Sequence, residues 1–392
     1  MAPKVARRAG IAPFYVMEVM KAAAARAAAG GDVLHLEVGQ PSTPAPRAVV
    51  DTAIAVVAGD PLHYTHALGT DELRAAIARW YRVRYGREVA AEQVGVTSGA
   101  SGACVLTFLA CFDEGDRVAV ARPSYPCYRQ MLTAFGIDVV DLPVDSSTRF
   151  QPTPAHLDAA VERHGPLAGL VVASPSNPTG TMVRDDELGA LARWCRARDV
   201  RLISDEIYHG LTYDQPAPTA LAHDRDAVVV NSFSKYFSMT GWRLGWTVLP
   251  DDLVEPVERL AQNLTVAPPT LAQRAAMGAF APDAVAELDG HVARYARNRD
   301  VVRAGLTDAG FERVAPADGA FYLWVDLRDH PRLGAEPDSE AFAATWLAEL
   351  GLATTPGIDF DPVDGSAFLR LSFAGSEVDM AEAARRIRTW AV

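Results

Sequence analysis

The chain has 392 residues, which is too many for one hydrophobic core of ordinary size, so we expect two domains. Hydrophobic residues make up 49% and charged residues 22%, which is typical of a globular protein, and the net charge of −12 argues against nucleic acid or an anionic membrane as the main partner. The four cysteines (Cys104, Cys111, Cys127 and Cys195) show no metal-binding spacing, so we expect no metal site and reduced thiols in a cytoplasmic protein.

The N-terminal residues do not have the pattern of a signal peptide or a membrane span, because Glu18, Lys21 and Arg26 interrupt the apolar stretch. An alanine-rich helix is predicted over 17–29, preceded by an arm that packs on a partner. A strand is predicted next over 33–38.

Two helices are predicted next, over 47–58 and from Thr70 or Asp71 to residue 85. From residue 93 the pattern alternates between strands and helices, which indicates repeated β-α-β units and a mostly parallel sheet covered on both faces. In such sheets ligands bind beyond the carboxyl ends of the strands. The predicted strands are 93–97, 117–121, 138–142, 168–173, 201–204, 227–230 and 244–249, and the helices between them are 99–112, 126–135, 154–163 and 185–198. Further on, a long helix is predicted over 291–306 and a strand pair over 310–325.

Small residues follow the first strand of this series, where Ser98-Gly99-Ala100-Ser101-Gly102 opens a helix. Free N–H groups at a helix start make an anion site suited to a phosphate. Close packing of the helix on the strand is the alternative. After the next strand, Tyr125 places an aromatic ring at the strand end.

The turns after two later strands carry polar residues. Asn177 lies in SPSNPTG, where it can donate from its amide or simply form the turn. Asp205 lies at a strand end, where a buried acid needs a cationic or hydrogen-bonding partner, unless it caps a short helix. Tyr208 follows three residues later and could equally belong to the core.

Lys235 lies in NSFSKYFSMTGWRLGW (residues 231–246), in which Arg243 is the only other charged side chain. Apolar surroundings and a nearby arginine lower a lysine pKa, and such a lysine is a nucleophile towards an aldehyde. A lysine with a buried stem and a solvated head is the alternative. Together the turns offer an imine-forming lysine, an anion site, an aromatic ring, an acid and phenol-binding donors, which are the groups that pyridoxal 5'-phosphate (PLP) needs.

The chain resembles the fold-type I PLP enzymes of the class I/II aminotransferase family from about residue 34 to 374. The resemblance rests on SPSNPTG, SDEIY, NSFSKYFSMTGWRLGW, GAFYLW and FLRLSFA, in family order and spacing. It implies an α/β fold with a mostly parallel central sheet between helices, plus a smaller α+β domain. The large PLP-binding domain would span residues 47–281, and both chain ends (1–46 and 282–392) would form the small domain.

The resemblance also implies a role for each site residue. Lys235 would hold PLP as an internal aldimine and later carry the proton at Cα, Asp205 would pair with the ring nitrogen, and Tyr208 with Asn177 would bond the phenolic oxygen. Members are usually homodimers with shared active sites. The remaining implied contacts are Tyr125 on the ring face, Ala100, Ser101, Ser232 and Arg243 on the phosphate, Tyr64 on the partner's phosphate, and Arg370, Asn177 and the Gly39 backbone on the substrate carboxylate.

The family implies a PLP-dependent aminotransferase acting on an amino acid and a 2-oxo acid, and a β-lyase or decarboxylase on the same scaffold is the alternative. A PLP-binding regulator would need a DNA-binding domain before residue 33, where we expect none. Two departures bear on the substrate: Ser42 stands where the family often has an acid, and P-G-x-x-F-G reads PGIDFD at 356–361.

The segments expected around the substrate side chain (11–16, Val38 and 263–270) are apolar, and no lysine lies in 99–102. A buried carboxylate without a partner is costly. We therefore expect alanine or a branched-chain amino acid as donor, with 2-oxoglutarate or pyruvate as acceptor. Arg7 or Arg8 on the N-terminal arm could still meet the distal carboxylate of glutamate.

Overall fold

The computed structural model describes residues 3–328, 330–333 and 336–391. Its largest sheet has seven strands in the order β2-β8-β7-β6-β5-β3-β4, and only β8 runs antiparallel to its neighbours. The predicted β-α-β alternation is thereby confirmed. The strands are β2 (Val94–Thr97), β3 (Arg117–Arg122), β4 (Asp138–Pro143), β5 (Gly169–Ala173), β6 (Arg201–Asp205), β7 (Val228–Ser232) and β8 (Gly245–Val248).

Both faces of this sheet are buried, which explains why its strands are apolar runs rather than alternating ones. Along β7, Val228 and Val230 pack in one hydrophobic cluster and Val229 in another. The first cluster includes Phe108 of α4 and Val257 of α8. The helices that accompany the sheet in the chain are α3 (Asp71–Tyr85), α4 (Gly99–Cys111), α5 (Pro126–Ala134), α6 (Pro154–His164), α7 (Asp185–Arg196) and α8 (Asp251–Leu264).

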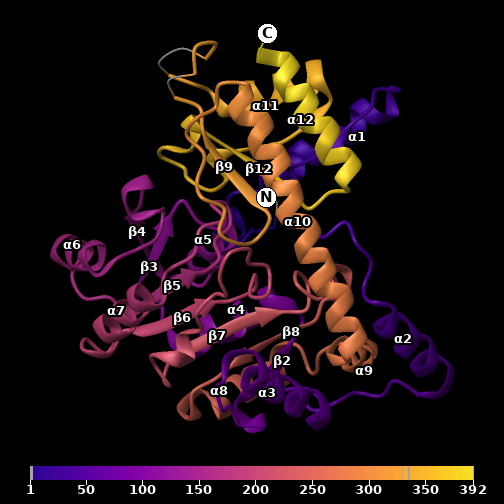
Figure 1. Cartoon of the computed structure of the whole chain (residues 1–392). Coiled ribbons are helices and arrows are strands. Elements are labelled where there is room, and N and C mark those ends of the chain that lie inside the picture. The colour runs from indigo at the N-terminus through magenta and orange to yellow at the C-terminus, as the bar shows by residue number, and fades with distance from the viewer. Residues whose placement is uncertain (1–2, 329, 334–335, 392) are drawn as a thin grey trace.

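A second group of elements lies beyond the large sheet and joins both ends of the chain (Figure 1). Strands β11 (Thr355–Pro356), β12 (Phe368–Ser372) and β9 (Tyr322–Asp326) form an antiparallel sheet, and β1 (Leu34–His35) pairs with β10 (Leu352–Ala353). The long helix α10 runs from the large sheet to this group, where it packs on α12 (Figure 1). The remaining helices are α1 (Val16–Ala28), α2 (Arg47–Gly59), α9 (Thr270–Ala276), α10 (Pro282–Asp308), α11 (Ser339–Leu350) and α12 (Glu377–Ala391).

Three predictions near the chain ends differ from the structure. The strand predicted over 33–38 is only the two-residue β1, and the helix predicted from 291 begins at Pro282. The strand pair predicted over 310–325 forms only in part: β9 pairs mainly with β12, and its pairing with the preceding residues is one antiparallel bridge between Val314 and Val325. Ala317 and Ala320 have positive φ, so this segment turns instead of extending. It packs against the SPSNPTG turn, where the Gly319 amide donates to Gly180.

In the part of the chain that the structure describes, no helix combines the length and apolar character needed to cross a bilayer. The boundaries of the two expected domains stay a prediction.

Candidate functional site

A cavity of about 330 Å³ opens beyond the carboxyl ends of β5, β6 and β7. A larger, more open groove of about 1400 Å³ lies where β6 begins and β8 ends, at the opposite edge of the sheet. Parallel sheets bind ligands at their carboxyl edge, so the smaller cavity is the candidate site. Its lining includes ten predicted site residues: Gly39, Ala100, Ser101, Tyr125, Asn177, Asp205, Tyr208, Lys235, Arg243 and Arg370.

Lys235 follows β7, and its amine lies near the rings of Tyr208 and Phe321. Its Nζ lies 5.7 Å from the centroid of the Tyr208 ring and donates a hydrogen bond of 2.5 Å to the Gly39 carbonyl. Burial, and then the positive charges of Arg370 and Arg243, lower the pKa of Lys235 to about 8. The lowered pKa increases the share of Lys235 that is neutral near neutral pH, and the neutral amine is the form that acts as a nucleophile or base.

Asp205 is the last residue of β6 and is buried, with an exposed fraction of 4%. The Tyr128 hydroxyl donates to its Oδ2, and the Ile207 amide donates to its Oδ1 over 3.0 Å. Burial raises the pKa of Asp205 to about 6, although these hydrogen bonds act in the opposite direction. A carboxylate in such a place is suited to holding a cationic group in the cavity.

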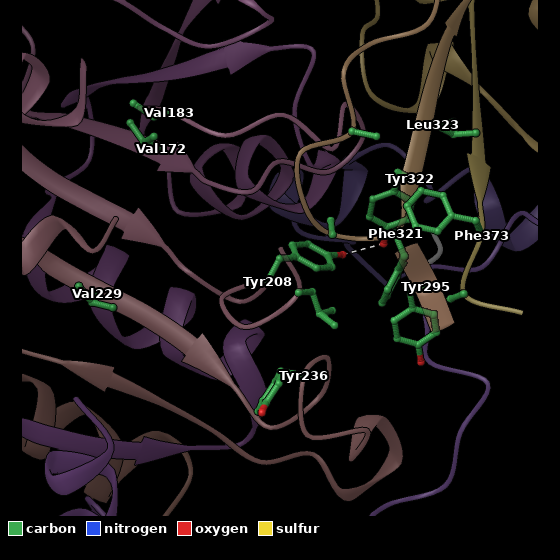
Figure 2. Close-up of a cluster of buried hydrophobic side chains, with 14 of the residues drawn as sticks. Val172, Val183, Tyr208, Val229, Tyr236, Tyr295, Phe321, Tyr322, Leu323 and Phe373 are labelled. Atoms are coloured by element: carbon green, nitrogen blue, oxygen red, sulfur yellow. Dashed lines mark hydrogen bonds between the residues drawn. The ribbon is translucent and has the colours of Figure 1, made fainter. Parts of the chain in front are cut away.

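Tyr208 and Tyr322 approach one another across the cavity from the two parts of the structure. Their hydroxyl oxygens are 2.6 Å apart, as the dashed line in Figure 2 marks. Tyr322 also lies against Gly39, because a Cβ at Gly39 would be 1.9 Å from the Tyr322 hydroxyl. Only glycine fits at position 39, which lets its carbonyl approach Lys235.

The first turn of α4 forms an anion site together with Arg243. The N-cap Ser98 makes no side-chain hydrogen bond to that turn, and no acidic residue lies in it. A Cβ at Gly99 would lie 2.6 Å from Arg243 Nη2, so the guanidinium lies directly over the helix start. Ser101, also in the first turn of α4, lines the cavity as well. Helix N–H groups and an arginine are the donors that bind a phosphate.

Arg370 lies on β12 and is almost fully buried. Its Nη1 donates over 2.9 Å to Asn177 Oδ1, and its Cζ is 4.6 Å from the ring centroids of both Tyr322 and Phe360. The Arg370 Nε is buried without a hydrogen-bond partner among the described residues. A buried, stacked guanidinium with a free donor is suited to binding a carboxylate.

The far end of the cavity is apolar. Tyr125, the N-cap of α5, packs edge-on against Phe14 with ring centroids 6.1 Å apart. Val16, Met17 and Met20 of α1 extend this wall. The expected apolar segment 11–16 therefore contributes Phe14 and Val16, while Val38 lines the cavity as well.

Two predicted contacts are not in the lining. Ser232 is buried, with its hydroxyl 2.8 Å from Ser234 Oγ, and Ser234 lines the cavity in its place. Tyr64 is 86% exposed on the surface, so its predicted contact with a partner's phosphate stays a prediction. Arg7 and Arg8 lie in an exposed 3₁₀ turn outside the lining.

Sequence reasoning missed Tyr128 and Tyr322. The first lies one helical turn after Tyr125, and the second lies in GAFYLW, so both were within recognised segments. No sequence pattern indicated their hydrogen-bond partners. Tyr128 bonds Asp205, 77 positions away, and Tyr322 bonds Tyr208, 114 positions away.

Comparisons with known proteins identify relatives along the whole chain. The model of the family described as aminotransferase class I and II matches residues 31–387. The valine–pyruvate aminotransferase of Mycobacterium tuberculosis is 51% identical over 392 residues, covering 100% of this chain and 99% of that protein. A crystal structure of an aminotransferase from Mycobacterium tuberculosis, also 51% identical, superposes with a TM-score of 0.95 over 99% of both chains. The aspartate/prephenate aminotransferase of Thermus thermophilus is 34% identical over 365 residues, covering 91% of this chain and 90% of that protein.

Proposed function

Since the chain belongs to the class I and II aminotransferase family, we propose that it is a PLP-dependent enzyme that takes the amino group of valine or a similar neutral aliphatic amino acid. Transfer of an amino group between an amino acid and a 2-oxo acid is the activity that its relatives establish. Transamination is therefore preferred to the β-lyase and decarboxylase alternatives. The acceptor that we propose is pyruvate, with 2-oxoglutarate as the second choice.

The choice of a neutral amino acid as donor rests on the charged side chains that line the cavity. Among the described residues that line it, only Asp205, Lys235, Arg243 and Arg370 have charged side chains. The cofactor and the α-carboxylate would occupy all four, so a distal carboxylate would have no cation to meet. Burying it unpaired would cost several kcal/mol, roughly, which disfavours aspartate as a donor. The 51% identical relative is named for valine and pyruvate, which supports the same choice.

The residues present fit PLP. The Arg243 guanidinium over the first turn of α4 matches a phosphate, and Asp205 matches a protonated ring nitrogen. Tyr208 and Asn177 offer donors for the phenolic oxygen, and Tyr125 offers an aromatic face. Residues 47–281 would then form the PLP-binding domain, with 1–46 and 282–392 forming the small one. When bound, PLP supplies an aldehyde that captures amino groups and a ring that accepts electrons from Cα.

Lys235, Arg370 and Asp205 would each have a separate role in the proposed reaction. Lys235 would attach the cofactor through Nζ and, once displaced by the donor, move the proton at Cα, for which a pKa of about 8 is suited. Arg370 would hold the α-carboxylate beside Asn177 and so orient the Cα–H bond. The Asp205 carboxylate would stabilise positive charge at the ring nitrogen.

We also propose a homodimer in the cytoplasm. Tyr64 is 86% exposed, and Ile54 and Val57 of α2, which precede it in the chain, are 63% and 61% exposed. Exposed apolar side chains such as these are suited to contact with a second copy of the chain. The cysteines are free thiols in this structure, which supports a reducing compartment.

The test is a half-reaction screen of the purified holoenzyme with single amino acids, which follows the cofactor spectrum as the amino form accumulates. We expect valine, leucine or alanine to convert the cofactor with a kcat/KM at least about tenfold above that of aspartate. Aspartate as the best donor would overturn the substrate proposal and leave the aminotransferase activity intact. Absence of a cofactor spectrum after reconstitution with PLP would overturn the cofactor proposal.

A further inference from the structure

The apolar wall of the cavity is built on a segment with few attachments to the rest of the molecule. Phe14, Val16, Met17 and Met20 line the cavity, yet α1 also exposes much of its surface, with Met17 50% exposed. The position of this wall relative to the other cavity residues therefore depends on the contacts that hold the start of α1.

Asp359 supplies two of those contacts at the first turn of α1, beside the hydrogen bonds that the Tyr15 hydroxyl donates to Glu340 and the Ala12 amide to Gln130. The Tyr15 amide donates to Asp359 Oδ1 over 3.0 Å, and the Val16 amide donates to Oδ2 over 3.3 Å. The N-cap of α1, Tyr15, makes no side-chain hydrogen bond to the helix. The Asp359 carboxylate, 344 positions from Tyr15, thus takes the place of a local cap. Its negative charge also interacts favourably with the positive end of the helix dipole.

The turn that carries Asp359 also contacts the carboxylate-binding residue. Asp359 ends the 3₁₀ turn Gly357–Asp359, and the next residue, Phe360, stacks on the Arg370 guanidinium at 4.6 Å. Two adjacent residues, Asp359 and Phe360, therefore contact the start of α1 and the guanidinium proposed to hold the α-carboxylate. The distance between these two ends of the substrate site is set through this turn.

We propose that Asp359 is a positioning residue that sets the side-chain selectivity of the enzyme by fixing the first turn of α1 relative to Arg370. This inference rests on the proposed aminotransferase function and extends it to a residue that does not line the cavity as the structure describes it. With the wall held in place, the branched methyl groups of valine contact Phe14 and Val16. The smaller side chain of alanine gains less from the same wall.

The test compares Asp359→Ala and Asp359→Asn with the wild-type holoenzyme. In Asp359→Ala we expect the ratio of kcat/KM for valine to that for alanine to fall about tenfold, because the wall is no longer held against the larger donor. The change should come from KM for valine, with kcat changed less than about threefold, since Lys235 and Asp205 are untouched. Asp359→Asn keeps one acceptor oxygen, so its ratio of kcat/KM for valine to that for alanine should lie between the ratios of the wild type and Asp359→Ala.

Hydrogen exchange gives a readout that does not depend on the substrate. Amides of residues 12–20 should exchange faster in Asp359→Ala, with exchange in the large sheet unchanged. Asp145→Ala is the matched control, because Asp145 accepts from the Ser147 amide at an exposed turn outside the cavity lining. Faster exchange with an unchanged valine-to-alanine ratio would overturn the role in selectivity, and unchanged exchange would overturn the role in holding α1.

The wild-type donor profile alone tests the proposed function. If valine is a poor donor, the ratio is measured with the best aliphatic donor instead, so failure of the valine proposal and failure of the Asp359 proposal give different results. Should Asp359→Ala not fold, the exchange and ratio measurements on Asp359→Asn decide the question.

Discussion

Arg122 Nη1 lies 2.6 Å from Asp361 Oδ1, in a contact where both side chains are nearly buried. Arg122 ends β3 just before the turn that carries Tyr125, and Asp361 follows the turn that carries Asp359. This ion pair therefore links the turn that carries Tyr125 to the loop whose Phe360 contacts Arg370. Asp361 stands where the resembled family pattern has glycine, and this ion pair gives the departure a structural role.

Replacing Asp361 with alanine is expected to lower the free energy of unfolding by about 3 kcal/mol, because the Arg122 guanidinium stays buried and loses its better-shielded partner. Asp364→Ala is the matched control. Asp364 also contacts Arg122, at 3.0 Å, but its side chain is 60% exposed, so its loss should cost less than about 1 kcal/mol. Urea unfolding measures both variants, and equal losses would contradict the prediction.

Lys235 should be the residue that binds the cofactor covalently. The chain contains only two other lysines, Lys4 and Lys21, both exposed. Borohydride reduction of the holoenzyme followed by peptide mass spectrometry should place the added cofactor mass on Lys235. Lys235→Ala should still bind PLP but lose at least about 10³-fold in turnover, whereas Lys21→Ala should behave as wild type. A label on another lysine would refute the assignment.

Asp205 should destabilise the cofactor-free protein at neutral pH. Its pKa is raised to about 6 in the folded state, above the ordinary value of 3.8. The unfolded chain therefore loses its proton first as pH rises, and folded-state stability falls between about pH 4 and pH 6. Asp205→Asn should raise the free energy of unfolding by roughly 2–3 kcal/mol at pH 8 and leave it nearly unchanged at pH 4.

The same Asp205→Asn variant should remove the Cα proton more slowly by orders of magnitude, because the ring nitrogen loses its counter-ion. Calorimetry of the cofactor-free protein and single-turnover kinetics of the holoenzyme measure the two effects. Near wild-type turnover would remove Asp205 from the site, and equal stabilisation at both pH values would contradict the raised pKa.

Arg370→Lys is expected to keep the charge and lose the fork that binds two carboxylate oxygens. The kcat/KM for valine should fall at least about 100-fold, mainly through KM, while the cofactor spectrum and PLP content stay those of wild type. Steady-state kinetics with full PLP occupancy measures this. A fall in PLP content with unchanged KM would instead place Arg370 among the cofactor contacts.

Tyr64 tests the proposed dimer. Because Tyr64 is 86% exposed in one chain, Tyr64→Phe should leave the stability of a protomer unchanged. If its hydroxyl reaches the partner's phosphate, PLP affinity should fall about tenfold, as expected for one hydrogen bond to a charged group. Sedimentation of the wild type should show a dimer, and a fully active monomer with unaltered PLP binding in the variant would refute shared active sites.

The sequence alone identified most elements of the large sheet, because buried parallel strands are short apolar runs between helical segments with turn signals. Helix α3 begins at Asp71 and ends at Tyr85 as predicted, since Thr70 caps it and Gly86 adopts the left-handed conformation that ends it. The order of the site motifs also brought nine of the predicted side chains and Lys235 to one cavity, because parallel strands end at the same edge.

Only the tertiary structure decided which residues far apart in the sequence meet. Tyr128 reaches Asp205, Tyr322 reaches Tyr208, and Asp359 reaches the start of α1, over separations of 77, 114 and 344 positions. Local periodicity determines where a helix or strand forms, but such pairs depend on how distant elements pack. In the same way the strand pair predicted over 310–325 is limited to one bridge at Val314, and Gly319 in that segment bonds the SPSNPTG turn instead.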